Sequence, residues 1–177
     1  YGGHTFRSHG DHGLGPVDMV RSIVLSSNVY YYSLANELGV DAMHDFMKPF
    51  GFGQKTGIDL EHERTGLLPS TAWKRTAFKK PAQQRWIPGD TISLGIGQGQ
   101  NTFTPLQMAH AIATLANNGV VMKPHLVKMT EDPQTRARTL TVPKESFRIP
   151  LKQENIDFIK NAMVGVVKEG TSEIGRA

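Results

Sequence analysis

The stretch that decides the fold is "GDTISLGIGQGQNTFTPLQMAHAIATLANNG", residues 89–119. Its second half predicts a helix, because Thr104 can cap the helix, Pro105 suits the first turn and Gly119 can end it. The apolar residues expected near one face of this helix are Leu106, Ala109, Ala113 and Leu115. Its first half is a short apolar run that predicts a buried strand entering a glycine-rich turn.

Further helices are predicted on both sides of this stretch. A helix is expected over 16–25 with Pro16 in its first turn, an apolar helix over 29–38 ending at Gly39, and a short helix capped by Asp41 over 41–50. A last amphipathic helix is expected over 153–170, with its apolar residues Ile156, Ile159, Met163 and Val167 at helical intervals. The chain is therefore predicted to be rich in helices.

The remaining segments predict turns and short strands. Residues 51–66 are rich in glycine and predict turns, and residues 120–129 predict a strand interrupted by Pro124. Residues 131–145 predict an exposed hairpin or loop. Helices with a few short strands indicate an α+β fold.

Composition narrows the function classes only slightly. Hydrophobic residues make up 38% and charged residues 20%, which is typical of a folded globular chain. The net charge of +4 fits a polyanionic or membrane-adjacent partner but demands neither, and the absence of Cys excludes disulfides and thiolate chemistry. No apolar run approaches the roughly 20 residues of a membrane span. The chain begins at Tyr1 rather than Met, so we interpret it as an internal piece of a longer protein.

The most informative chemical motif is "VLSSNVYYY", residues 24–32. Ser26 and Asn28 lie two positions apart, so in a locally extended turn their side chains can point to the same side. A hydroxyl beside a carboxamide offers a proton relay and a two-way hydrogen-bonding group for a peptide-like substrate. Taken alone, the triplet is explained better as a helix cap.

Together these motifs resemble the transpeptidase domain of penicillin-binding proteins, and they do so over nearly the whole chain. The blocks "GDTISLGIGQG" and "TPLQMAHAIATLANNG" are the most specific. "HGLGPVDMVRSIVLSSN" and "WKRTAFKKPAQQRWIPGDTISLGIGQG" resemble the elongation-type class B members more closely. The resemblance implies an α+β fold with helices packed on an antiparallel sheet, as in the serine β-lactamases. Residues 1–177 would be a partial transpeptidase domain that supplies mainly helices and lacks the upstream nucleophile segment and the downstream K-[TS]-G strand.

The resemblance also implies roles for two residues. Ser26 would pass a proton between an activating Lys and the leaving amine, and Asn28 would hydrogen-bond the substrate peptide or a β-lactam amide. The S-x-x-K motif that carries the nucleophile in this family is absent. In "STAWK", Lys74 stands four places after Ser70, so Trp73 and Lys74 are predicted to lie on a surface segment.

A second family signature, Lys-Thr-Gly, occurs in "FGFGQKTGIDL", residues 50–60. In this family the catalytic triplet lies on a strand after the C-terminal helix, which would place it beyond Ala177. Lys55 follows Asn28 closely and precedes the glycine block. We therefore interpret Lys55-Thr56-Gly57 as a structural loop.

The activity implied for the parent is a D,D-transpeptidase that cross-links peptidoglycan stem peptides ending in D-Ala-D-Ala through a serine acyl-enzyme. Its expected partners are these peptides, β-lactam antibiotics and a membrane glycan polymerase, with no cofactor, and the fragment itself would be inactive. The expected location is the periplasmic face of the inner membrane of a Gram-negative bacterium, with the anchor outside this chain. An inactive sensor or binding module and a β-lactamase-like hydrolase remain as alternatives.

Other candidate sites are weaker. His4, His9, Asp11 and His12 invite a metal site, but their spacing is not that of a recognised zinc motif. The basic aromatic segment 73–86 is predicted to be an exposed loop with a solvated charge run rather than a nucleic-acid site. "GIGQG" lacks the dinucleotide fingerprint and predicts a tight turn beside the active-site sheet.

Overall fold

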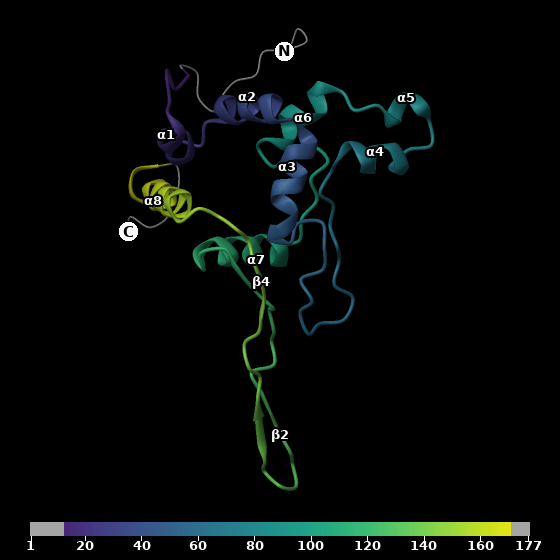
Figure 1. Ribbon diagram of the computed structural model, residues 1–177, viewed down its shortest axis with the longest axis vertical. Helices are drawn as coiled ribbons and strands as arrows, with labels where there is room; N and C mark the ends of the chain where they lie inside the picture. Colours follow the sequence, from purple (N-terminus) through teal and green to yellow (C-terminus); the bar gives the residue numbers. More distant parts are fainter. Residues whose placement is uncertain (1–12, 171–177) are drawn as a thin grey trace. The chain divides into compact units, whose positions relative to one another are not determined.

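A computed structural model describes residues 13–170 of the chain, and these residues form two compact units (Figure 1). The first unit comprises residues 13–46, 69–101 and 152–170, and the second comprises residues 47–68 and 102–151. Each unit is described by itself below.

The first unit is helical. Its helices are α1 (Met19–Val24), α2 (Asn28–Leu38), α3 (Val40–Met47), α4 (Thr71–Ala77), α5 (Pro81–Gln84), α6 (Pro88–Leu94) and α8 (Gln153–Glu169). Among them α1 packs against α8, α2 packs against α6, and α4 lies beside α5. The segment 73–86, predicted as an exposed loop, is therefore largely helical.

Local capping decides where these helices begin and end. The first helix starts at Met19 and not at Pro16, because the Asp18 carboxylate accepts a hydrogen bond from the Arg21 amide at 2.8 Å. The predicted end of α2 at Gly39 is confirmed. Helix α3 starts at Val40, so the prediction that Asp41 caps it is wrong, and Asp41 lies in its first turn.

The strand predicted around residue 92 is wrong, since this segment is helix α6. Pro88 occupies the first turn, and the Asp90 carboxylate accepts a hydrogen bond from the Ile87 amide at 3.3 Å. The predicted burial is confirmed, because Ile92 and Leu94 are buried. A short buried apolar run has no clear period, so a strand and a helix are equally compatible with it.

The second unit combines one long helix with short strands. Its elements are η1 (Lys48–Phe50), α7 (Pro105–Ala116), β1 (Val120–Met122), β2 (Met129–Glu131), β3 (Arg138–Leu140) and β4 (Glu145–Arg148). The core of the unit is Phe52, Leu68 and Ala111, against which Met47, Phe50 and Phe103 pack.

Helix α7 is confirmed, with Thr104 as its cap in a capping box with Gln107. Its buried residues, however, are Gln107, Ala111 and Thr114 and not the predicted apolar set. The Gln107 side chain is fully buried, and its Nε2 donates to the Gln54 carbonyl at 2.6 Å and to the Thr65 carbonyl at 2.7 Å. The helix therefore buries a polar residue because that residue satisfies the carbonyls of the turn-rich segment 51–66.

Helix α8 is also confirmed, but its buried face is narrower than predicted. Ile156 and Ala162 are buried, whereas Val167 is 58% exposed.

Residues 120–148 form a long two-stranded arm (Figure 1). Near α7, β1 pairs antiparallel with β4, and farther out β2 pairs antiparallel with β3. Hydrogen bonds from the Lys123 amide to the Lys144 carbonyl and from the Thr141 amide to the Lys128 carbonyl, both 2.9 Å, link the two sheets. The predicted interruption near Pro124 and the predicted hairpin are confirmed.

Helices with small antiparallel sheets confirm the α+β class. Within residues 13–170 there is no helix with the length and apolarity needed to cross a membrane.

Candidate active-site turn

The candidate site is the turn that joins α1 to α2. Ser26 has φ 53°, in the left-handed region, and Ser27 is the buried N-cap of α2. Asn28 is the first residue of that helix and is half-buried. Ser27 therefore takes the N-cap position that the sequence predicts, but its side chain makes no capping hydrogen bond, and the turn is left-handed at Ser26 and not extended there as we expected.

Backbone hydrogen bonds hold this turn closed. The Ser26 amide donates to the Ile23 carbonyl at 3.2 Å, and the Ser27 amide donates to the Ser22 carbonyl at 2.9 Å. Ser26 is exposed. Within residues 13–170, neither the Ser26 hydroxyl nor the Asn28 carboxamide makes a hydrogen bond. No residue of the described range 13–170 therefore occupies either polar group by a hydrogen bond.

A partly buried pair of hydroxyl groups lies between the two helices that flank the turn. The Ser22 hydroxyl is fully buried, donates to the Met19 carbonyl at 2.7 Å and shares a 3.2 Å hydrogen bond with the Tyr31 hydroxyl. Ser22 lies on α1 and Tyr31 lies on α2. The pair therefore joins the two helices that carry the turn.

At two glycines, neighbouring segments approach α1 and α2 closely. A Cβ at Gly165 of α8 would lie 2.8 Å from Val24 Cγ2 on α1. A Cβ at Gly95, the residue after α6, would lie 2.6 Å from the Tyr31 carbonyl oxygen and from the Ala35 Cβ on α2. Real Cβ contacts are longer than this, so glycine lets α8 and α6 approach the turn's helices closely. The prediction of turns in "GIGQG" is confirmed, since Gly97 and Gly99 have positive φ.

The Lys55-Thr56-Gly57 triplet lies in a loop, as predicted. The Glu63 carboxylate accepts hydrogen bonds from the Thr56 amide and the Thr56 hydroxyl, both at 2.6 Å, and from the Gly57 amide at 3.1 Å. Burial opposes the charge on Glu63, but these hydrogen bonds outweigh it and lower its pKa. The Thr56 and Gly57 amides and the Thr56 hydroxyl are thus hydrogen-bonded within the loop, and Lys55 is exposed.

The prediction that Lys74 lies on a surface segment is wrong. Lys74 is 7% exposed, forms an ion pair with Asp90, and its Nζ lies 5.2 Å from the centre of the Trp86 ring. The Ser70 hydroxyl caps α4 by accepting from the Trp73 amide at 3.0 Å. The "STAWK" segment therefore builds a buried contact between α4 and α6, because Asp90 supplies the counter-charge.

A hollow lies at the C-terminal end of α2. An open cleft of about 540 Å³ is lined by Asn36, Leu38, Gly39, Val40, Asp41, Ala42, Thr71, Trp86, Pro88 and Thr91. The Asp41 carboxylate accepts from the Thr71 hydroxyl at 2.7 Å and from the Thr71 amide at 2.8 Å, which lowers the pKa of Asp41. An 11-residue helix is roughly 16 Å long, so this cleft is separate from the Ser26–Asn28 turn.

Metal binding has no support in the part of the chain that the structure describes, where there is no group of three or more His, Cys, Asp or Glu able to hold an ion. The weak candidates His4, His9, Asp11 and His12 lie outside the described residues.

Comparison with known proteins decides the family. The family model of the penicillin binding protein transpeptidase domain matches residues 1–176. The chain belongs to this family. The resemblance inferred from the sequence motifs is thereby confirmed.

Individual relatives agree with this assignment. The chain is 40% identical over 171 residues to a peptidoglycan D,D-transpeptidase MrdA of Acinetobacter baumannii, covering 95% of this chain and 24% of the relative. It is similar to the crystal structure of Pseudomonas aeruginosa PBP2 in complex with WCK 5153, with TM-score 0.82, 38% identity, and coverage of 97% of this chain and 38% of the other.

It is also similar to a structure described as "Structural coordination of polymerization and crosslinking by a peptidoglycan synthase complex", with TM-score 0.81 and 32% identity, over 98% of this chain and 28% of the other. The chain thus spans about a quarter of the length of its curated relative.

Proposed function

We propose that the chain is a partial transpeptidase domain, residues 1–177, of an elongation-type class B penicillin-binding protein of the penicillin-binding protein 2 kind. The similarity to the MrdA protein over 95% of the chain is the observation that carries this proposal. The parent, meaning the longer protein that contains this chain, would be a peptidoglycan D,D-transpeptidase.

The proposed reaction is acyl transfer in two steps. A serine hydroxyl outside this chain attacks the carbonyl between the two D-Ala residues, the peptide C–N bond breaks, and D-Ala leaves with the proton that the serine lost. An amine of a neighbouring stem peptide then attacks the acyl-serine ester, and the serine oxygen leaves and regains a proton. A β-lactam would acylate the same serine, in agreement with the name of the family.

In this reaction Ser26 would relay the proton between the activating Lys and the leaving amine. Its exposed hydroxyl and the strained left-handed backbone at φ 53° support this role, since such strain clusters at functional sites. Asn28 would bind the substrate amide, because a carboxamide both donates and accepts hydrogen bonds. The chain would need no cofactor for these roles.

The proposed partners and location follow from the family resemblance. One structurally similar protein comes from a peptidoglycan synthase complex of polymerization and crosslinking, which supports a membrane glycan polymerase as partner of the parent. The parent would act on stem peptides at the periplasmic face of the inner membrane of a Gram-negative bacterium.

Fluorescent penicillin tests the proposal on the purified parent and on the 177-residue chain. The parent should form a covalent adduct that lasts minutes or longer and should release D-Ala from a D-Ala-D-Ala peptide. The chain alone should stay unlabelled. An unlabelled parent would instead indicate a sensor or binding module, and rapid release of hydrolysed penicillin would indicate a β-lactamase-like hydrolase.

A further inference from the structure

The arm is interrupted between its two sheets. The last backbone hydrogen bond on the inner side joins Lys123 to Lys144, and the first on the outer side joins Lys128 to Thr141. The intervening segments are residues 124–127 on one strand and the shorter 142–143 on the other, and together they are called the junction. Within residues 13–170 no backbone hydrogen bond links these two segments.

The sequence of the junction explains why the strand pairing stops there. Pro124 lies on one segment and Pro143 on the other, and proline has no amide hydrogen to donate to a neighbouring strand. The unequal lengths of the two segments make the longer one a bulge, which leaves backbone groups unpaired and bends the strand. The free amides of the junction therefore need a partner outside the two strands.

Asp59 supplies that partner. Its Oδ1 accepts a hydrogen bond from the Leu126 amide at 2.7 Å, and its Oδ2 accepts one from the Val127 amide at 3.0 Å. The bond from Val127, followed by that from Leu126, lowers the pKa of Asp59, so this carboxylate is ionised at physiological pH. Asp59 belongs to the loop 51–66 and not to the arm, so these bonds tie the junction to that loop.

The loop that carries Asp59 is held firmly on α7. The buried Gln107 side chain of α7 donates to a carbonyl near each end of the loop. Within the loop, the Glu63 carboxylate accepts hydrogen bonds from the Thr56 and Gly57 amides at 2.6 Å and 3.1 Å. The position of Asp59 is therefore fixed relative to α7.

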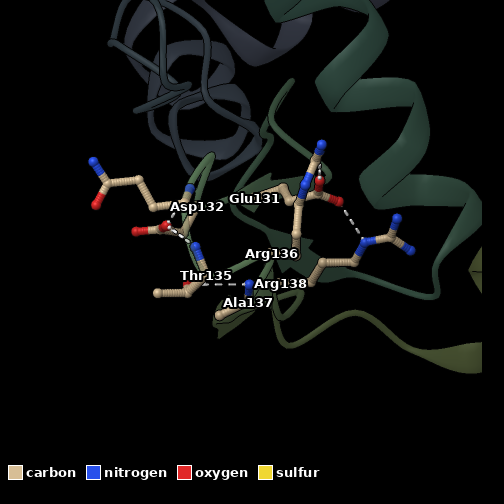
Figure 2. A network of polar contacts seen from close by, with 7 residues as sticks. Glu131, Asp132, Thr135, Arg136, Ala137 and Arg138 are labelled. Carbon is tan, nitrogen blue, oxygen red and sulfur yellow. Dashed lines mark hydrogen bonds and ion pairs between the residues drawn. The ribbon is translucent and has the colours of Figure 1, made fainter.

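The part of the arm beyond the junction, residues 128–141, is held together by its own contacts and is called the outer hairpin. Strands β2 and β3 pair along it. Figure 2 shows the contacts near its turn, where Arg138 donates to Glu131 and the Thr135 amide donates to Asp132, both at 2.7 Å. Within residues 13–170 no hydrogen bond or ion pair joins the outer hairpin to a residue outside it.

A rigid hairpin on an unpaired junction has the construction of a hinge, in which a few residues absorb the change in backbone angles. Asp59 is exposed, so its bonds to the junction can open without unfolding of the unit. We propose that the outer hairpin rotates as one body about the junction, and that the Asp59 carboxylate restrains it in one orientation. This inference concerns the second unit and holds whether or not the proposed function is correct.

Distances between two spin labels test the rotation. The labels are attached to Met108→Cys on α7 and to Gln134→Cys at the turn of the outer hairpin, in the full-length parent with any native cysteine replaced by serine. Both positions are exposed. Asp59→Ala removes the restraint. Glu61→Ala is the matched control, because it removes a carboxylate from the same loop and its side chain is 94% exposed.

Amide hydrogen exchange distinguishes rotation from unfolding. In Asp59→Ala the Leu126 and Val127 amides should exchange about tenfold or more faster, because they lose their acceptor. The hydrogen-bonded amides of β2 and β3 should keep their exchange rates within about twofold. Asp59→Asn keeps one acceptor oxygen and should give an intermediate effect, which provides a second reading if the alanine variant fails to fold.

The expected result is one narrow distance distribution in the parent and in Glu61→Ala, and a broader or second distribution in Asp59→Ala. An unchanged distribution in both Asp59 variants, a distribution already broad in the parent, or an equal change in Glu61→Ala would overturn the proposal. Faster exchange throughout β2 and β3 in the Asp59 variants would also overturn it, since Asp59 would then stabilise the hairpin itself and not its orientation.

Discussion

The backbone conformation of Ser26 is unfavourable for a non-glycine residue, so contacts from neighbouring residues must hold it there. A non-glycine residue in the left-handed region costs on the order of 1–3 kcal/mol, and Ser26 lies there at φ 53°. The hydrogen bond from the Ser27 amide to the Ser22 carbonyl and the partly buried Ser22–Tyr31 hydroxyl pair resist relaxation of this turn. A substitution at Tyr31 should therefore change the stability of this turn.

Tyr31→Phe removes one hydroxyl and leaves the ring in place. We expect penicillin acylation of the parent to slow several-fold, because α1 loses its side-chain tie to α2 beside the turn, and local stability to fall by about 1 kcal/mol. Stopped-flow acylation and amide exchange at residues 22–31 measure the two effects. The matched control is Tyr30→Phe, whose hydroxyl makes no hydrogen bond within residues 13–170. Equal effects of both substitutions would contradict this role of the hydroxyl pair.

Gln107→Leu tests the buried polar anchor of the second unit. The substitution keeps the volume but leaves the Gln54 and Thr65 carbonyls without their donor, so the loop 51–66 should lose about 3 kcal/mol or more of local stability. Hydrogen exchange across residues 51–66 and 104–116 measures this loss. Met108→Leu, at a neighbouring position 47% exposed, should change little, and an unaltered exchange rate in Gln107→Leu would count against the anchor.

Sequence reasoning placed Lys74 wrongly and missed the burial of Gln107, and both failures have the same physical cause. Lys74 and Gln107 are polar residues buried by partners far away in sequence, Asp90 for the first and Gln54 and Thr65 for the second. Hydrophobic periodicity contains no signal for such partners. The Thr104–Gln107 capping box, by contrast, is local and can be found from spacing alone.

At the scale of elements, two glycines decide how the helices around the turn pack. Gly95 lets the end of α6 reach α2, and Gly165 lets α8 reach α1. The existence of α2, α7 and α8 could be predicted because each is long and has a clear cap or periodicity. Helix α6 could not be distinguished from a strand, since its identity depends on what buries it.

Gly95→Ala should therefore destabilise the α2–α6 contact. The added Cβ would lie 2.6 Å from the Tyr31 carbonyl oxygen, and relieving such overpacking costs about 1–3 kcal/mol. Thermal unfolding of the parent measures the cost. Gly89→Ala, inside α6 and with open space around its Cβ, should be neutral or stabilising by up to about 1 kcal/mol. An equally stable Gly95→Ala variant would show that the close approach is unimportant.

The contact between α3 and α4 should depend on pH through Asp41. Hydrogen bonds from the Thr71 hydroxyl and amide lower the pKa of Asp41 below its ordinary value of 3.8. Its contribution to stability is therefore full above that ordinary value and is lost as pH falls through the lower folded pKa. Exchange of the Thr71 amide should accelerate in that acid range beyond the intrinsic pH effect. Asp41→Asn should exchange faster at neutral pH and lack this acid transition, and an identical profile would contradict the assignment.

At the scale of the whole molecule, the family could be inferred from the sequence because its longest motifs are specific, whereas the division into two units and the pairing of β1 with β4 emerged only from the structure. The chain spans about a quarter of its curated relative, so the acyl-transfer activity is proposed for the parent. Two short motifs, Ser26-Ser27-Asn28 and Lys55-Thr56-Gly57, are candidates for a role in that activity. The Thr56 and Gly57 polar groups are bound by Glu63, whereas the Ser26 hydroxyl is exposed and unbonded within residues 13–170.

The most direct test compares the penicillin acylation rate of the parent with that of its Ser26→Ala and Lys55→Ala variants. Proton relay by Ser26 predicts a loss of about 10²- to 10⁴-fold in Ser26→Ala. The Lys55→Ala variant should acylate at nearly the rate of the unaltered parent. A loss of several orders of magnitude in Lys55→Ala, with Ser26→Ala unchanged, would contradict the account.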